Sequence, residues 1–191
     1  MCELILASSS RRRCEILKKT GVPFQVVETD VDEGFQPDEH PEALVRRLGF
    51  MKADKAYRMF NGTRHVIGAD TLVFCDGILS KPVDEEDAFR ILRILSGREH
   101  TVMTGGVVME KETGLLHWFC EKTAVVFEEL SDREILSYIA TGEPMDKAGA
   151  YGIQDGGGVF VRSIQGCYYN VMGFPLNRIY RILKAIGLTG A

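Results

Sequence analysis

Cysteine is scarce in this sequence and follows no pattern. Five cysteines are spread widely over the 191 residues, an odd number without any C-x-x-C spacing: Cys2, Cys14, Cys75, Cys120 and Cys167. Such a set argues against a disulfide framework and against a cysteine-based structural zinc site. We expect reduced thiols, as in a cytoplasmic protein.

Long apolar runs and an excess of basic residues are also missing. The apolar run at residues 3–7 is short and is followed by arginines rather than preceded by them, unlike a signal peptide. No stretch approaches the length that spans a membrane. The formal net charge is -4, so the surface as a whole does not suit a nucleic-acid backbone. We expect a cytoplasmic protein with neither a membrane nor a nucleic acid as its partner.

Two further signatures are absent from the sequence. The four histidines show no H-x-x-x-H or H-x-H spacing, which argues against a catalytic zinc site. Neither a G-x-x-x-x-G-K-S/T loop nor a G-x-G-x-x-G run after a strand occurs. Ordinary P-loop and dinucleotide-binding folds are therefore not expected.

The sequence does contain the pattern of one α/β domain over residues 1–191. Hydrophobic residues make up 45% and charged residues 26%, as in globular proteins, and no repeat or linker interrupts them. Strands are predicted at 3–7, at 23–33 running into an acidic loop, from 65 to Asp70, in a hairpin about Asp76-Gly77, in an antiparallel pair at 100–128 turning near Thr113-Gly114, and at 159–166. Helices are predicted at 11–21 with Gly21 as C-cap, 40–60, 84–98, 131–143 with a capping box from Ser131 to Glu134, and 175–187. We expect a mixed sheet with flanking helices and two lobes around a cleft.

The stretch LILASSSRRRCEIL, residues 4–17, predicts a strand, a tight turn and the first turn of a helix. Backbone N–H groups and the positive end of the helix dipole meet there, a place suited to phosphate. Ser8 and Ser10 can donate hydroxyl hydrogen bonds, and arginines add bidentate contacts. An N-cap serine followed by a solvated basic turn explains the same residues. However, cations at a helix N-terminus oppose the dipole unless an anion offsets them.

Carboxylates and lysines elsewhere form a second group of candidates. Asp70 in VIGADT is predicted at the end of a buried strand, where open α/β sheets bind ligands, although turn-capping is also common for aspartate. Glu33 ends the acidic run TDVDE, which suits Mg²⁺ or is a solvated loop. Lys52 and Lys81 by themselves are ordinary surface lysines.

Together, these segments resemble the Maf family. The matching segments are LILASSSRRRCEILKKTG, VDE, VIGADTLV, SKP, LSGREHTVMTG, EPMDKAGAYGIQ and GFPL, which follow in the family's order and span nearly the whole chain. The resemblance implies a fold related to the inosine triphosphatases and a cytoplasmic nucleoside triphosphate pyrophosphatase. Such an enzyme releases a nucleoside monophosphate and pyrophosphate with a divalent metal such as Mg²⁺, Mn²⁺ or Co²⁺. The resemblance also implies a homodimer.

Site roles follow from the same resemblance. Asp70 matches the proposed general base. The family's polar catalytic cluster is matched by Glu33, Lys52 and Lys81, and its metal ligands by Glu33 and Asp70. The phosphate-binding opening is matched by Ser8, Ser10, Arg12 and Arg13.

Three positions resemble the subgroup that acts on dTTP and UTP: Arg12, Thr71 and Gln154. The subgroup acting on 7-methyl-GTP instead carries Trp, Gln and Glu there. One departure is Arg11, where the family usually has proline at the first helical position; its absence leaves the loop less rigid and bears on affinity more than on the reaction. The family is also associated with the cleaning of canonical or modified nucleotides from the pool and with inhibition of septum formation. A nucleotide-binding regulator of septum formation without catalysis is therefore the alternative.

Overall fold

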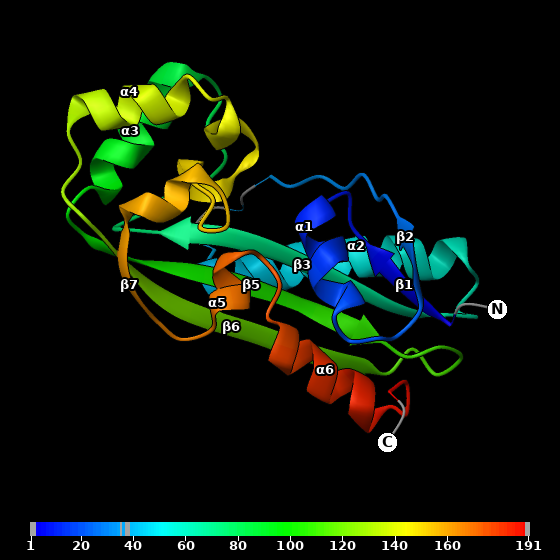
Figure 1. Ribbon diagram of the computed structural model, residues 1–191. Helices are drawn as coiled ribbons and strands as arrows, with labels where there is room; N and C mark the ends of the chain where they lie inside the picture. The colour runs from blue at the N-terminus through cyan, green and yellow to red at the C-terminus, as the bar shows by residue number, and fades with distance from the viewer. Residues whose placement is uncertain (1–2, 35, 37–38, 190–191) are drawn as a thin grey trace. The chain divides into compact units, whose positions relative to one another are not determined.

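The computed structural model describes residues 3–34, 36 and 39–189, which form a seven-stranded mixed sheet with helices beside it (Figure 1). The strands are β1 (Leu4–Ala7), β2 (Phe24–Val27), β3 (His65–Phe74), β4 (Ile78–Leu79), β5 (Glu99–Met109), β6 (Leu116–Phe127) and β7 (Val161–Gln165). The α-helices are α1 (Arg11–Lys18), α2 (Pro41–Met59), α3 (Glu85–Leu95), α4 (Asp132–Ile139), α5 (Tyr168–Val171) and α6 (Leu176–Ala185). Short 3-10 helices are η1 (Glu143–Asp146), η2 (Ala148–Ala150) and η3 (Gly156–Phe160). The predicted α/β class is confirmed.

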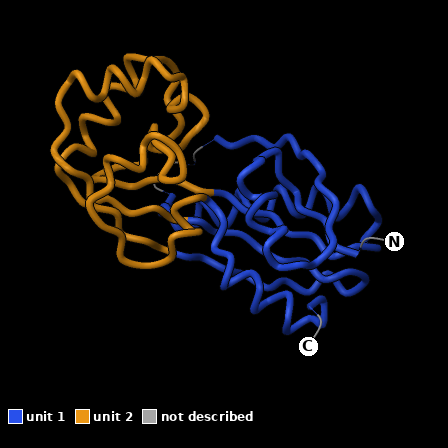
Figure 2. Tube along the Cα trace, in the orientation of Figure 1, with its two compact units in different colours: residues 1–70, 104–121, 173–191 blue, residues 71–103, 122–172 orange. Residues whose placement is uncertain are grey.

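The chain divides into two compact units (Figure 2). Unit 1 comprises Met1–Asp70, Thr104–Glu121 and Gly173–Ala191, and unit 2 comprises Thr71–Met103 and Lys122–Met172. The sheet order is β2-β1-β3-β5-β6-β7, with β4 paired to β3. Three of these strands, β3, β5 and β6, contribute residues to both units. The single domain over residues 1–191 stays a prediction.

In unit 1, β1 pairs in parallel with both β2 and β3. The two crossovers run in opposite directions along the sheet, so right-handed connections place α1 and α2 on opposite faces, as Figure 1 shows. Ile5 and Ala7 of β1 pack with Ala53 and Ala56 of α2. Because side chains alternate along a strand, the other two residues of β1 face the α1 side. All four β1 side chains are buried, as the apolar run predicts.

Three glycines let α2 approach the sheet backbone closely. A Cβ added at Gly68 of β3 would lie 2.2 Å from the carbonyl oxygen of Gly49 on α2. One added at Gly106 of β5 would lie 2.1 Å from the carbonyl oxygen of Gly68. No larger side chain fits at either place without moving the helix or a strand. This contact brings the next turn of α2, which carries Lys52, to the strand that carries Asp70.

In unit 2, the predicted hairpin is confirmed by the pairing of β3 with β4, in which Val73 lies opposite Leu79. The predicted antiparallel pair is also confirmed, because adjacent strands joined by so short a connection as that between β5 and β6 run in opposite directions. Helix α4 begins with the predicted capping box, in which Ser131 and Glu134 each accept a hydrogen bond from the other's backbone N–H. The unit's core includes a buried aromatic group: Phe127, Tyr151, Phe160 and Tyr138.

The strand expected to end at Asp70 in fact continues to Phe74. Its pairing with β1 ends where Ala7 lies opposite Gly68, but β3 runs on and pairs with β4. The apolar residues after Asp70 therefore belong to the same strand and not to a separate one. Asp70 still lies beyond the end of β1, so the carboxylate follows the carboxyl end of that neighbouring strand.

Other element ends differ from the predictions. The last predicted strand begins at Val161 because Val159 and Phe160 belong to η3. Helix α4 ends at Ile139, and a glycine of positive φ, Gly142, separates it from η1. Helix α1 ends at Lys18 with Lys19 as its cap, so Gly21 lies in the following turn, where its φ is +75°.

The described cysteines are free thiols, and Cys2 lies outside the described residues. Within residues 3–34, 36 and 39–189, none of the helices combines the length and the apolar character that a membrane crossing requires.

Candidate active site

The N-terminus of α1 is organised by two serines. Ser10 is the N-cap, and its Oγ accepts a hydrogen bond from Arg13 N at 3.4 Å. Ser8 is buried, and its Oγ accepts from Ser10 N at 3.1 Å. The capping role considered from the sequence is thus confirmed, and each hydroxyl uses its oxygen as an acceptor. Arg11 occupies the first helical position, and its Nε lies 3.1 Å from Glu15 Oε1 in an exposed pair.

Arg13 is a buried cation next to this cap. Its Nη1 donates to the carbonyl oxygen of Ala69 at 2.8 Å and its Nε to that of Gly173 at 2.9 Å. Burial lowers the pKa of Arg13, whereas the charges of Asp70 and Glu33 oppose that shift. The guanidinium therefore ties α1 to β3 and to the segment before α6, and its charge faces both carboxylates. Its neighbour Arg12 is half-buried.

Lys52 joins the two predicted carboxylates. Its Nζ lies 2.6 Å from Asp70 Oδ1 and 2.5 Å from Glu33 Oε1. The Lys52 and Asp70 side chains are 11% and 16% exposed, whereas that of Glu33 is 53% exposed. Both carboxylates therefore face one ammonium group, and solvent or a ligand reaches the group from the Glu33 side.

Arg47 of α2 holds the loop that carries Glu33. Its guanidinium makes two contacts of 2.7 Å with the carboxylate of Glu39 and donates to the carbonyl oxygen of Gly34 at 2.9 Å. The hydrogen bond from Arg47 lowers the pKa of Glu39. Lys55 of the same helix donates to the carbonyl oxygen of Asp30 on the other side of Glu33. Sequence reasoning missed these residues because their partners lie outside the helix, where spacing of three or four residues gives no signal.

Two carboxylates are a small but suitable donor set for Mg²⁺. This ion prefers oxygen ligands and is held in many enzymes by one or two carboxylates, with water and substrate phosphates completing its shell. Among the described residues, no group of three or more His, Cys, Asp or Glu side chains is placed to hold a metal ion. Glu33 and Asp70 therefore fit an ion that takes most of its ligands from water and phosphate.

The remaining predicted site residues belong to unit 2. Thr71 follows Asp70 directly along β3 and is half-buried. Lys81 is exposed and follows β4, where the carbonyl oxygen of Ser80 accepts from Gly149 N at 3.2 Å. Gln154 is exposed in a turn before η3. The structure thus gathers Arg13, Glu33, Lys52 and Asp70 within unit 1, while Thr71, Lys81 and Gln154 lie in unit 2.

Fold and site together define a class: an α/β protein in which a capped helix N-terminus and a lysine–carboxylate cluster follow the carboxyl end of a parallel strand. A family model described as "Maf-like protein" matches residues 3–186. The chain belongs to the Maf family, as the sequence motifs predict.

Similar proteins cover nearly the same length. A protein of Geobacillus sp. (strain WCH70) named dTTP/UTP pyrophosphatase is 47% identical over 188 residues, which are 98% of this chain and 100% of that protein. One of the same name from Alkaliphilus metalliredigens is 46% identical over 183 residues, 96% of this chain and 95% of that protein. Another, from Geotalea uraniireducens, is 48% identical over 185 residues, again 96% and 95%.

Proposed function

We propose that this protein hydrolyses nucleoside triphosphates, preferring dTTP and UTP, to the monophosphate and pyrophosphate. The observation that carries the proposal is the ion-pair cluster of Lys52 with Asp70 and Glu33 beside the buried Arg13. The names of relatives that match nearly the whole chain support the choice of substrate.

In the proposed reaction, Asp70 takes a proton from a water molecule as the water oxygen attacks the α-phosphorus. The bond between that phosphorus and the bridging oxygen breaks, and pyrophosphate leaves with the bond's electron pair. The positive charges of Lys52, Lys81 and Arg13 stabilise the negative charge that develops on the phosphate oxygens. Because Lys52 already contacts Asp70, the base and one of these charges are held together before substrate binds.

The triphosphate is proposed to bind at the start of α1. Ser8 and Ser10 accept backbone hydrogen bonds in the structure, so their hydroxyl protons are the groups that would donate to phosphate oxygens. Arg12 and Arg13 add positive charge at the same helix end, where a phosphate would offset the unfavourable meeting of cations and helix dipole.

A divalent metal ion is part of the proposal. Glu33 and Asp70 would hold it, and Mg²⁺, Mn²⁺ or Co²⁺ would neutralise phosphate charge when bound. The ion-pair cluster itself would orient the two carboxylates for this role, since both already converge on one cation.

Base selection is assigned to Arg12, Thr71 and Gln154. A glutamine amide offers a donor and an acceptor, as the imide edge of uracil or thymine requires, whereas an ionised glutamate offers acceptors alone. We also propose that the protein is cytoplasmic and homodimeric and removes canonical or modified pyrimidine nucleotides. A non-catalytic regulator of septum formation is not favoured, because the relatives bear the names of enzymes.

The test is a nucleotide panel with product identification, run with and without Mg²⁺, Mn²⁺ and Co²⁺. We expect dTTP and UTP to give the monophosphate and pyrophosphate, with activity dependent on added metal. A diphosphate and orthophosphate as products would contradict the proposed cleavage site. Equal turnover after chelation of metals would contradict the metal requirement alone.

A further inference from the structure

The segment that carries Gln154 is a tight turn within unit 2. Asp155 N donates to the carbonyl oxygen of Gly152 at 3.2 Å, so Gln154 is the third residue of a four-residue turn. The Gln154 side chain is exposed. A turn of this kind, projecting an exposed side chain, keeps one conformation only where its backbone is held from outside.

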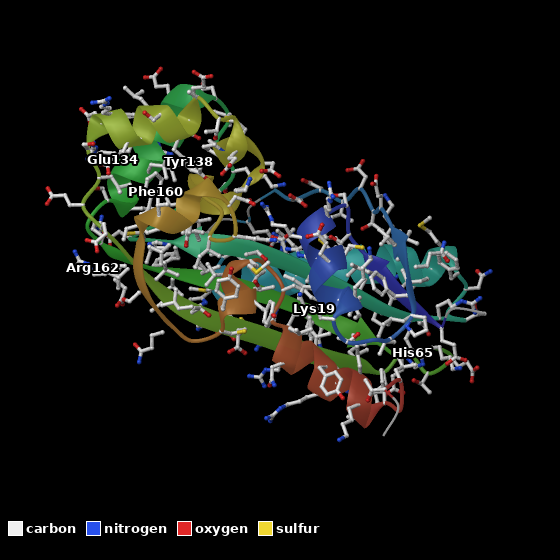
Figure 3. The ribbon with its side chains drawn as sticks, in the orientation of Figure 1. Lys19, His65, Glu134, Tyr138, Phe160 and Arg162 are labelled. Atoms are coloured by element: carbon white, nitrogen blue, oxygen red, sulfur yellow. The ribbon has the colours of Figure 1, made fainter. Side chains whose placement is uncertain are left out.

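A buried tyrosine holds the first end of this turn. The hydroxyl oxygen of Tyr138 on α4 accepts a hydrogen bond from Gly152 N at 3.2 Å. The ring is 5% exposed and lies edge-on to Phe160, with 5.2 Å between ring centroids (Figure 3). Burial raises the pKa of Tyr138 to about 12, so the hydroxyl stays neutral. The fit is close, since a Cβ at Gly157 would lie 2.8 Å from the Tyr138 oxygen.

A glutamate holds the other end. Glu143 Oε2 accepts from Gly156 N at 3.0 Å, on the far side of Gln154 from Gly152. The Glu143 carbonyl oxygen accepts in turn from Lys147 Nζ at 2.6 Å. The Lys147 side chain is 8% exposed, and its Nζ lies 3.8 Å from Asp155 Oδ2 in the turn itself. Backbone and side chain of Glu143 therefore belong to one network around the turn.

We propose that Tyr138 and Glu143 are positioning residues for base selection, acting by fixing both ends of the Gly152–Gly156 turn that presents Gln154. This inference rests on the proposed function, in which Gln154 contacts or orients the base. A side chain held in its binding conformation loses little freedom when the nucleotide binds, whereas a loose turn reduces the fraction of molecules ready to bind.

The test compares four variants of the full chain on dTTP, UTP and 7-methyl-GTP in Mg²⁺. Tyr138→Phe removes the acceptor for Gly152 N but keeps the ring against Phe160, and Glu143→Ala removes the acceptor for Gly156 N. Glu143→Gln keeps an oxygen acceptor and serves as the rescue. Tyr168→Phe, at an exposed tyrosine of the same unit, is the matched control.

We expect Tyr138→Phe and Glu143→Ala each to raise KM for dTTP about tenfold, with kcat changed less than about threefold. Their preference for dTTP over 7-methyl-GTP should fall, and the amides of residues 152–156 should exchange hydrogen faster. Glu143→Gln and Tyr168→Phe should stay within about threefold of wild type in KM.

Gln154→Ala in the same assay separates the possible failures. If Gln154→Ala loses the preference while Tyr138→Phe and Glu143→Ala keep it, the inference is wrong and the proposed function stands. Lower kcat and stability with an unchanged preference would also overturn the inference, because they indicate a structural role alone. A wild-type protein without activity on dTTP and UTP overturns the proposed function, and the inference with it.

Discussion

The Lys52 ammonium lies 2.6 Å from Asp70 Oδ1, although the two residues are 18 positions apart and belong to a helix and a strand. The contact depends on the closeness of α2 to β3, which Gly49 and Gly68 permit one helical turn away. Packing against backbone thus sets the distance between two charged groups. The predictions below test this packing, the groups it joins and the core of unit 2.

Replacing Asp70 should affect the chemical step most. We expect Asp70→Asn to lower kcat for dTTP about a hundredfold or more, because an amide cannot take the proton from water. KM should change much less, since the variant keeps the size of the side chain. Pyrophosphate release at saturating dTTP measures the effect, and near-normal turnover would remove Asp70 from the role of base.

Adding a methyl group at Gly68 should push α2 from the sheet. A Cβ there would lie 2.2 Å from a backbone oxygen, so we expect Gly68→Ala to lower the free energy of unfolding by about 1–3 kcal/mol. Gly77→Ala is the matched control, because nothing lies within 4 Å of its added Cβ and its φ is not positive. Urea unfolding compares the two, and equal losses would argue against a tight contact at Gly68.

Arg47 should influence the reaction through the loop of Glu33. We expect Arg47→Ala to lower kcat roughly tenfold or more, because the loop loses its bond at Gly34 and its ion pair at Glu39. Arg58→Ala removes an exposed pair on the same helix and should leave kcat unchanged. Steady-state kinetics on dTTP distinguishes the variants. The same kcat for both would show that Arg47 does not position Glu33.

Acid should destabilise the protein through His100. Burial lowers the pKa of His100 to about 4, and its Nε2 lies 2.8 Å from the Tyr151 hydroxyl between aromatic rings. The unfolded chain binds the proton near pH 6.5 and the folded one near pH 4. Stability is therefore full above pH 6.5 and is lost as the pH falls towards 4, by roughly 3 kcal/mol.

The check is urea unfolding of wild type and His100→Gln at pH 7 and pH 5. The variant has no imidazole to protonate, so its unfolding free energy should change less between the two pH values. Parallel losses in both proteins would assign the acid sensitivity to other groups.

The three base-selection residues are tested as a set. The triple variant Arg12→Trp, Thr71→Gln, Gln154→Glu should shift preference from dTTP and UTP towards 7-methyl-GTP by about ten- to a hundredfold in kcat/KM. A wild-type preference for 7-methyl-GTP would refute the assignment. A folded triple variant with unchanged preference would show that other residues select the base.

Much of the local structure was predictable because its causes are local. The apolar run before Ser8 predicts β1, the Ser131-to-Glu134 capping box predicts the start of α4, and Asp76-Gly77 predicts the hairpin of β3 and β4. The end of β3 was not predictable in this way. Its length depends on which neighbouring strands continue past Asp70, and β1 stops before β4 begins to pair.

The sequence by itself determined the family, the α/β class and the identities of the candidate groups, because motifs, periodicity and capping patterns lie within short segments. Only the tertiary structure decided that Lys52 lies between Asp70 and Glu33, that Arg47 holds the Glu33 loop, and that Arg13 is buried against backbone carbonyls. These contacts join segments far apart in the chain. Their distances follow from how closely helix and sheet backbones pack, which no spacing along the sequence encodes.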